Sequence, residues 1–206
     1  MDISRPFAAV SPGVESDVLV DLAGVTVGRT GREVARRTGR SPTGVQHALD
    51  RLVDHGLVHQ TPAGRAYLYS FNREHLLAPA VEVMAGTRRE LLERLRTLIG
   101  EWKVPTFHAS VFGSYARGEG NAASDIDLLV VRPKEIDIED EQWRDQLFEL
   151  RERVRDWTGN PAGTIEISEA ELPRLRKERP PVIEEVITQA IDLAGMPARK
   201  MLRAGR

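Results

Sequence analysis

The chain of 206 residues contains no cysteine, and this absence removes several kinds of chemistry at once. Disulfide bonds, thiolate nucleophiles and zinc sites built on cysteine are excluded, and such a composition suits a reducing compartment. The sequence also lacks an apolar run long enough to span a bilayer, and its first residues lack the apolar core of a signal peptide. We therefore expect a soluble cytoplasmic protein with no membrane partner.

Neither sign of charge is in large excess, because 29 Lys and Arg stand against 31 Asp and Glu. The chain as a whole therefore attracts neither nucleic acid nor membranes, and any anion-binding surface has to be local. A length of 206 residues is enough for two small domains. We expect a first domain over 1–74, a helical connector over 75–103 and a second domain over 104–206.

Signals for three helices and a hairpin follow one another in the first domain. Apolar residues at helical spacing predict a helix over 15–22. The stretch "TGREVARRTG" over 30–39 contains a capping box and ends in glycine, and "SPTGVQHALDRLVDHG" over 41–56 begins with a serine cap and a proline. Alternating residues on both sides of a turn predict a hairpin over 57–71. This order predicts a winged helix-turn-helix domain.

In a winged helix the third helix enters the major groove of DNA, while the tip of the hairpin contacts the phosphate backbone. The predicted DNA contacts are polar side chains on that helix and one arginine at the tip: Thr43, Gln46, His47, Arg51 and Arg65. Two alternatives remain open, because any surface helix shows polar residues to solvent and winged helices also dock proteins. The segment 30–71 resembles the winged helix of the multiple-antibiotic-resistance-regulator type, which implies DNA as a partner.

Residues 75–102 predict a helix with a break near Pro79 and one apolar side. The apolar stripe consists of Leu91, Leu92, Leu95, Leu98 and Ile99. Such a stripe packs either on a domain of its own chain or against a second copy, and in the second case the protein is a homodimer.

A turn suited to phosphate follows the strand-like run "FHASVFGS" in the second domain. Gly113 lets the backbone approach an anion, and Ser114 offers a hydroxyl where the N–H groups of a short helix converge. Arg117 shares a helix face with Ser114. Taken alone, however, a Gly-Ser after a strand is only a turn signal.

The stretch "SDIDLLVV" places two carboxylates at the start of a buried strand. Side chains alternate along a strand, so Asp125 and Asp127 lie on the same face. Neighbouring like charges repel, and hard oxygen ligands at this spacing suit Mg²⁺. The alternative is that Asp125 caps a turn and Asp127 faces water.

In this order and spacing, "GSYARG" and "SDIDLLV" resemble the signature of the DNA polymerase β-like nucleotidyltransferase superfamily, in particular its minimal nucleotidyltransferase branch, over about residues 107–167. The resemblance implies a small mixed sheet, so that the whole chain is α+β. It implies that two Mg²⁺ ions, or Mn²⁺ in their place, bind with a nucleoside triphosphate such as ATP. The implied phosphate-binding residues are Gly113, Ser114 and Arg117, and the implied metal ligands are Asp125 and Asp127.

Members of that superfamily also use a third carboxylate on a later strand. In "NPAGTIEISEAEL", Glu166 shares a face with Thr164 and Ser168, and we select it as the third catalytic carboxylate and metal ligand. It departs from the aspartate usual in the superfamily. Glu169 is the second choice, and the alternative for Glu166 is an exposed strand residue without a function.

These features predict a Mg²⁺-dependent nucleotidyltransferase that transfers NMP from an NTP to a hydroxyl of a protein, an RNA or a small molecule. The resemblance brings toxin–antitoxin pairs into consideration, and the winged helix either targets the enzyme or regulates its own transcription. The alternative is a transcriptional regulator whose second domain only senses nucleotide. The segment 180–195 predicts one helix covering the sheet, and the basic stretches "RLRKER" and "ARKMLRAGR" predict either solvated surface or nucleic-acid contacts.

Overall fold

The computed structural model describes residues 1–3 and 5–203. The chain divides into two compact units, one of residues 5–88 with Asp2 and one of residues 89–203 with Met1 and Ile3. Each unit combines helices with a small sheet, so the predicted α+β class is confirmed. Within the described ranges, no helix has the length and apolar character needed to cross a membrane.

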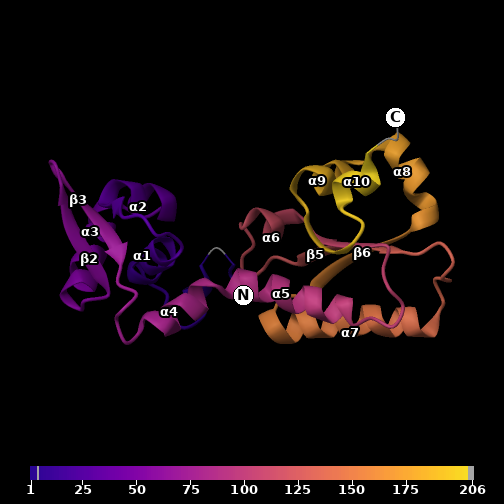
Figure 1. Ribbon diagram of the computed structural model, residues 1–206, viewed down its shortest axis with the longest axis horizontal. Helices are drawn as coiled ribbons and strands as arrows, with labels where there is room; N and C mark the ends of the chain where they lie inside the picture. Colours follow the sequence, from indigo (N-terminus) through magenta and orange to yellow (C-terminus); the bar gives the residue numbers. More distant parts are fainter. Residues whose placement is uncertain (4, 204–206) are drawn as a thin grey trace. The chain divides into compact units, whose positions relative to one another are not determined.

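The N-terminal unit is a winged helix-turn-helix, as predicted (Figure 1). Its helices are η1 (Pro6–Ala9), α1 (Val14–Ala23), α2 (Gly31–Thr38), α3 (Pro42–Asp54) and α4 (Ala78–Ala85). Its strands are β1 (Arg29–Thr30), β2 (Val58–Ala63) and β3 (Ala66–Phe71), which form an antiparallel sheet in the order β1-β3-β2. The short strand β1 was not predicted, because two residues carry no periodicity.

Capping fixes the helix-turn-helix as the sequence predicts. The side chain of Thr30 accepts a bond from the N–H of Glu33, whose carboxylate accepts one from the N–H of Thr30. Gly39 ends α2 with a positive φ of 65°. Ser41 then caps α3 by accepting from the N–H of Gly44 at 3.2 Å. Both helices therefore begin where their polar caps stand.

Two separate helices occupy the segment predicted as a connector. The helical conformation is interrupted at Gly86, between α4 and α5 (Thr87–Gly100). Pro79 lies in the first turn of α4, where its missing N–H leaves no hydrogen bond unmade. Helix α4 packs into the core of the N-terminal unit through Val81. The stripe of α5 is buried in the core of the C-terminal unit, with Leu95 wholly inaccessible. The stripe therefore packs on its own domain, with Leu92 and Leu98 only partly buried, and the homodimer stays a prediction.

A four-stranded mixed sheet forms the centre of the C-terminal unit, in the order β6-β5-β4-β7. Its strands are β4 (His108–Val111), β5 (Ile126–Arg132), β6 (Ala162–Ser168) and β7 (Ile191–Gly195). Strand β5 is parallel to β6 and antiparallel to β4, which is also antiparallel to β7. The remaining elements are α6 (Gly113–Arg117), α7 (Glu141–Thr158), η2 (Glu169–Glu171), α8 (Leu172–Glu178), α9 (Pro181–Gln189) and α10 (Ala198–Leu202).

Helices cover both faces of this sheet (Figure 1). On one face α5 and α7 pack against Ile126, Leu128 and Val130. On the other face α8, α9 and α10 pack against Leu129 and Val131. The alternation along β5 therefore separates an α7 face from an α9 face, and each residue of β5 and β6 belongs to one of them.

The C-terminal third differs from the predicted single helix over 180–195. Helix α9 ends at Gln189, because Ala190 is already extended, and Ile191 and Leu193 continue as β7 against β4. Gly195 ends β7 with a positive φ of 73°, where a Cβ would overlap the carbonyl oxygen of Phe107. The stretch "ARKML", the first part of the second basic stretch, forms α10, and residues 204–206 lie outside the described residues.

Candidate active site

The two predicted aspartates lie together at the start of β5. Asp125 is exposed just before the strand, and Asp127 is half-buried as its second residue. Because Asp127 alternates with Leu128, its side chain lies on the α9 face. Burial raises the pKa of Asp127, the charges of Asp125 and Glu185 raise it further, and Arg117 partly opposes them. Deprotonated Asp127 thus lies in a negative environment that a cation would relieve.

Two glycines leave space beside the Asp127 carboxylate. Gly113 has a φ of +69°, and a Cβ there would overlap Oδ2 of Asp127. On the neighbouring strand, a Cβ at Gly163 would lie 3.1 Å from Oδ1. The N–H of Phe112 also donates to the carbonyl oxygen of Asp127 at 2.9 Å. The predicted phosphate turn and the predicted metal pair are therefore in contact.

The turn itself is held by residues around Ser114, which is half-buried in the first turn of α6. Tyr115 is buried next to it and donates its hydroxyl to the carbonyl oxygen of Met1 at 2.8 Å. The carbonyl oxygen of Ser114 accepts from the N–H of Glu119 at 2.8 Å. The backbone of the turn is thus fixed while its N-terminal side lies against Asp127.

Arg117 connects α6 to α9. Its Nε donates to Glu119 at 2.7 Å, and its Nη1 donates to Glu185 and, at 3.0 Å, to Gln189. The resemblance implies phosphate binding for Arg117, whereas these bonds anchor α6 to α9. Glu185 and Gln189 had not been singled out, because nothing in the sequence indicates that α9 lies beside α6.

Asn160 positions the loop that carries Asp125, and this residue was also missed. It is wholly buried, and its Nδ2 donates to the carbonyl oxygens of Asn121 at 3.0 Å and Ser124 at 2.8 Å. A buried asparagine needs such partners for its amide. The sequence places Asn160 between a glycine and a proline, which indicates a turn and gives no sign of burial.

Glu166 is on the wrong face of the sheet for the predicted third ligand. The register pairs Asp127 with Gly163 and Val130 with Glu166, so Glu166 lies on the α7 face. There its Oε1 accepts from Nε1 of Trp143 at 2.8 Å and from Nε of Arg132 at 3.0 Å. This carboxylate therefore satisfies a buried tryptophan and an arginine. The prediction failed because the count of alternating residues on β6 did not fix its register with β5.

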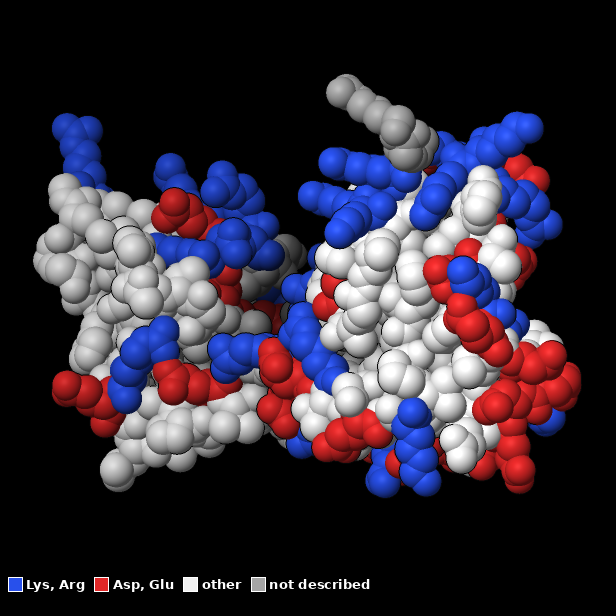
Figure 2. Space-filling view, turned by 45° about the vertical axis from the view of Figure 1, so that its right-hand side comes forward, with Lys and Arg blue, Asp and Glu red and all other residues white. Residues whose placement is uncertain are grey.

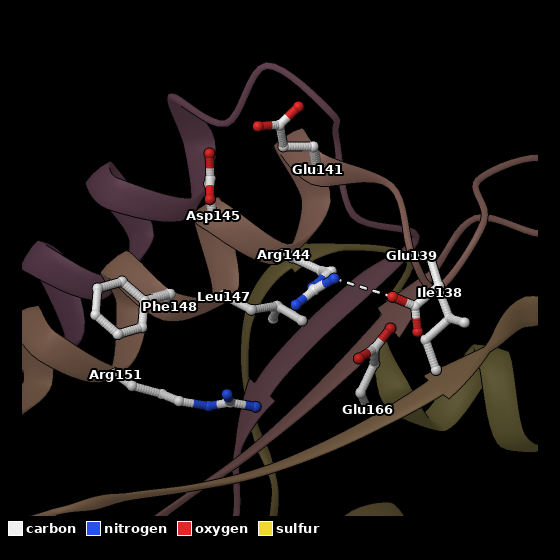
Figure 3. A pocket seen from close by; sticks show the side chains of 9 residues that line it. All are labelled: Ile138, Glu139, Glu141, Arg144, Asp145, Leu147, Phe148, Arg151 and Glu166. Carbon is white, nitrogen blue, oxygen red and sulfur yellow. Dashed lines mark hydrogen bonds and ion pairs between the residues drawn. The ribbon is translucent and has the colours of Figure 1, made fainter.

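A pocket of about 840 Å³ opens beside Glu166 along α7 (Figure 3). Arg144 and Phe148 of α7 line it, and Arg144 forms an ion pair with Glu139 at 2.9 Å. The pocket does not include the aspartate pair. The second choice, Glu169, lies in η2, where it accepts from the N–H of Lys134 at 3.4 Å.

The donor set at the aspartate pair consists of two carboxylates. In residues 1–3 and 5–203, no three His, Cys, Asp or Glu side chains converge as a metal-binding group. On the α9 face β6 offers Gly163 and Ile165 beside the pair, so it supplies no further carboxylate there. Two carboxylates fit a Mg²⁺ that keeps its waters or arrives with phosphate oxygens, which is how proteins usually hold this ion.

The predicted DNA contacts fall into two groups in the N-terminal unit. Three are exposed and form no ion pair within the described residues: Thr43, His47 and Arg65. The amide of Gln46 donates to Asp50 at 2.8 Å and to the hydroxyl of Tyr69 at 3.1 Å, and Arg51 forms an ion pair with Glu15. Gln46 and Arg51 are thus engaged within the unit.

Residues 88–185 match the family model described as a nucleotidyltransferase domain. This part of the chain is thus similar to nucleotidyltransferase domains. The match includes α6, β5 and the aspartate pair, and it ends within α9. None of the curated proteins matches the chain.

Solved structures similar to the chain include regulators and a toxin–antitoxin pair. A DNA-binding transcriptional regulator from E. coli is 28% identical, with 36% of this chain and 72% of that chain covered and a TM-score of 0.30. A MarR-family regulator from Rhodococcus sp. RHA1 is 22% identical, with 48% and 70% covered and a TM-score of 0.33. A mutant of the toxin–antitoxin MntA-HpeT is 16% identical, with 54% and 80% covered and a TM-score of 0.38.

Proposed function

We propose that the nucleotidyltransferase domain transfers NMP from a nucleoside triphosphate to a hydroxyl acceptor in a Mg²⁺-dependent reaction. The acceptor oxygen forms a bond to the α-phosphorus, the bond from the α-phosphorus to the β-phosphate breaks, pyrophosphate leaves, and the hydroxyl proton passes to solvent. The observation that carries this proposal is the contact between the turn at Gly113 and the carboxylate of Asp127. The turn is suited to phosphates, and the aspartate pair is suited to a cation bound to those phosphates. The acceptor is a protein, an RNA or a small molecule.

Each residue of the site has a defined task in this proposal. Gly113 and Ser114 receive the phosphates through backbone N–H groups and a hydroxyl. Asp125 and Asp127 hold the cation, which when bound stabilises the charge of the triphosphate and lowers the pKa of the acceptor hydroxyl. Arg117 keeps α6 against α9, so that the turn stays in place. Catalysis would consist of placement and charge neutralisation.

A second candidate, nucleotide sensing without turnover, is favoured by Gly163. This residue stands beside Asp127 where a third carboxylate would be needed to hold a second metal ion. Two-metal phosphoryl transfer relies on a clamp of two ions about 3.5–4 Å apart. With two carboxylates, the site suits the ion that accompanies the nucleotide better than it suits a pair of ions.

The N-terminal unit would bring DNA to the protein, either to target the transferase or to regulate its own transcription. Arg65 at the hairpin tip and the exposed Thr43 and His47 on α3 are the contacts that remain free. Winged helices place these two elements on the backbone and in the major groove.

Purified protein incubated with each labelled NTP, Mg²⁺ and a cell extract tests the proposal. A labelled acceptor that forms with wild type and not with Asp127→Asn supports transfer. Tight NTP binding without a labelled product supports the sensor. Label transfer by Asp127→Asn with an undiminished need for metal would overturn the assignment of Asp127.

A further inference from the structure

The C-terminal part of the chain carries a local excess of positive charge. Residues 172–206 contain eight Lys and Arg against four Asp and Glu, although the whole chain has a formal charge of −2. Figure 2 shows Lys and Arg side chains gathered at the top of the C-terminal unit, where Figure 1 places α8 and α10. A local excess of positive charge of this kind can attract anions although the chain as a whole is nearly balanced in charge.

Five cations in this region form no ion pair within the described residues, and we call them the basic track: Arg176, Lys177, Arg199, Lys200 and Arg203. Two of them are nevertheless fixed in place. Nε of Arg176 donates to the carbonyl oxygen of Met201 at 2.9 Å, and Nε of Arg199 donates to that of Ile187 at 3.2 Å. A carbonyl oxygen orients a guanidinium without cancelling its charge, so the track is ordered and positive.

The track lies on the same face of the sheet as the aspartate pair and reaches it through α9. Arg199 donates to the carbonyl oxygens of Ile187 and, at 3.5 Å, Thr188. The next residue, Gln189, accepts from Arg117 of α6 at 3.0 Å. Helix α9 therefore contacts both Arg199 of the track and α6, the helix that begins at the turn beside Asp127.

We propose that the basic track binds the phosphodiester backbone of a single-stranded nucleic acid and leads its terminal hydroxyl to the aspartate pair as the acceptor. The inference rests on the proposed function and narrows its acceptor. Several spaced cations match a chain of phosphates better than a single anion. A single strand can present its end beside Asp127, whereas the end of a duplex is held by base pairing.

The basic track has one part on α8 and another on α10, and these two helices contact each other. Lys177 follows Arg176 and Lys200 precedes Met201, the two residues joined by a hydrogen bond, and both lysine side chains are exposed and form no ion pair within the described residues. They are therefore suitable positions for charge reversal without loss of structure. Lys103 and Arg155 serve as matched controls, since they are exposed cations without ion pairs in the described chain and lie outside α8–α10.

Fluorescence anisotropy of an end-labelled single-stranded RNA tests binding without metal or NTP. We expect Lys177→Glu/Lys200→Glu to bind at least about tenfold more weakly at low salt, and its plot of log affinity against log salt to be shallower by about one to two units. Lys103→Glu/Arg155→Glu should bind like wild type. Equal losses in both double variants, or no loss in the first, would overturn the proposal.

Two further arms identify the ligand. A single-stranded DNA of the same sequence tests whether the backbone alone suffices, and binding of both strands through Lys177 and Lys200 supports the backbone assignment. The variant Arg65→Glu tests the winged helix, and it should leave single-strand binding unchanged. Loss of binding in Arg65→Glu alone would assign the strand to the other unit and overturn the proposal.

Transfer of labelled nucleotide to the strand completes the test. A free 3′ hydroxyl should accept label, a blocked 3′ end should not, and Lys177→Glu/Lys200→Glu should raise the strand concentration needed for half-maximal transfer. Unchanged transfer by that variant would overturn the acceptor role. Failure of the proposed function is distinguishable, because it removes label from every acceptor and leaves RNA binding unaltered.

Discussion

Asp127 and Glu166 are carboxylates on adjacent strands of one sheet, and their surroundings are opposite. Glu166 accepts bonds from Trp143 and Arg132 on the α7 face, where its side chain is 19% exposed. Asp127 lies on the α9 face between two glycines, where burial and the charges of Asp125 and Glu185 raise its pKa. A carboxylate with its own hydrogen-bond donors, such as Glu166, stabilises the fold, whereas a carboxylate beside like charges, such as Asp127, is a candidate ligand-binding group.

Asp127 and Glu166 should differ most in how strongly their replacement lowers nucleotide transfer. Asp127→Asn should lower nucleotide transfer by roughly a thousandfold, because it removes a charged ligand for the cation. Glu166→Gln should retain activity within a few-fold, since it lies on the other face of the sheet. Initial rates with labelled NTP measure both. Equal losses of activity in Asp127→Asn and Glu166→Gln would contradict the different roles of the two carboxylates.

For the free energy of unfolding we expect the opposite order, with Glu166 contributing more than Asp127. Glu166→Ala leaves Nε1 of Trp143 and Nε of Arg132 without their acceptor, so the free energy of unfolding should fall by about 2–4 kcal/mol. Glu166→Gln keeps an acceptor oxygen and should lose less. Urea denaturation gives these values, with Glu169→Ala as a control in the neighbouring η2. An unchanged midpoint for Glu166→Ala would mean that the two bonds contribute nothing.

A substitution at Gly163 would change the surroundings of Asp127 without touching Glu166. Gly163→Asp would add a carboxylate beside Asp127, and we expect Mg²⁺ to bind several-fold more tightly because the ligand charge rises. Gly163→Asn is the control of similar size without the charge. Calorimetric titration with Mg²⁺ measures the affinity. Weaker binding by Gly163→Asp than by Gly163→Asn would show that the position does not face the cation.

The smallest effect concerns pH. Because the folded-state pKa of Asp127 is raised, the unfolded chain loses this proton first, and stability falls as the pH rises from about 3.9 to the folded-state value. The penalty persists above that value, so Asp127→Asn should be slightly more stable than wild type at neutral pH and equal to it in acid. Thermal melts across pH measure the difference. A variant less stable than wild type at neutral pH would contradict the raised pKa.

Local signals in the sequence predicted much of this fold. The capping box at Thr30, the serine cap at Ser41 and the alternation along β5 depend on near neighbours, and each has the expected structure. The strand β7 was missed because Ile191 and Leu193 extend the apolar pattern of α9, and only pairing with β4 decides their conformation.

The site was predictable up to the point where it depended on contacts between distant segments. The turn at Gly113 and the aspartate pair are contiguous motifs, and the structure brings them into contact. The face of Glu166 depends on the register of β6 with β5, and the anchoring of Arg117 depends on α9, which follows it by about seventy residues in the sequence. The spacing of residues within one segment contains no information about either contact.

We propose that Asp127 holds the cation of a bound nucleotide and that Glu166 does not. Calorimetric binding of a non-hydrolysable NTP analogue with and without Mg²⁺ tests it most directly in wild type, Asp127→Asn and Glu166→Gln. We predict that Mg²⁺ tightens binding in wild type and Glu166→Gln alike and has little effect in Asp127→Asn. Mg²⁺-dependent binding that survives in Asp127→Asn and disappears in Glu166→Gln would contradict this account.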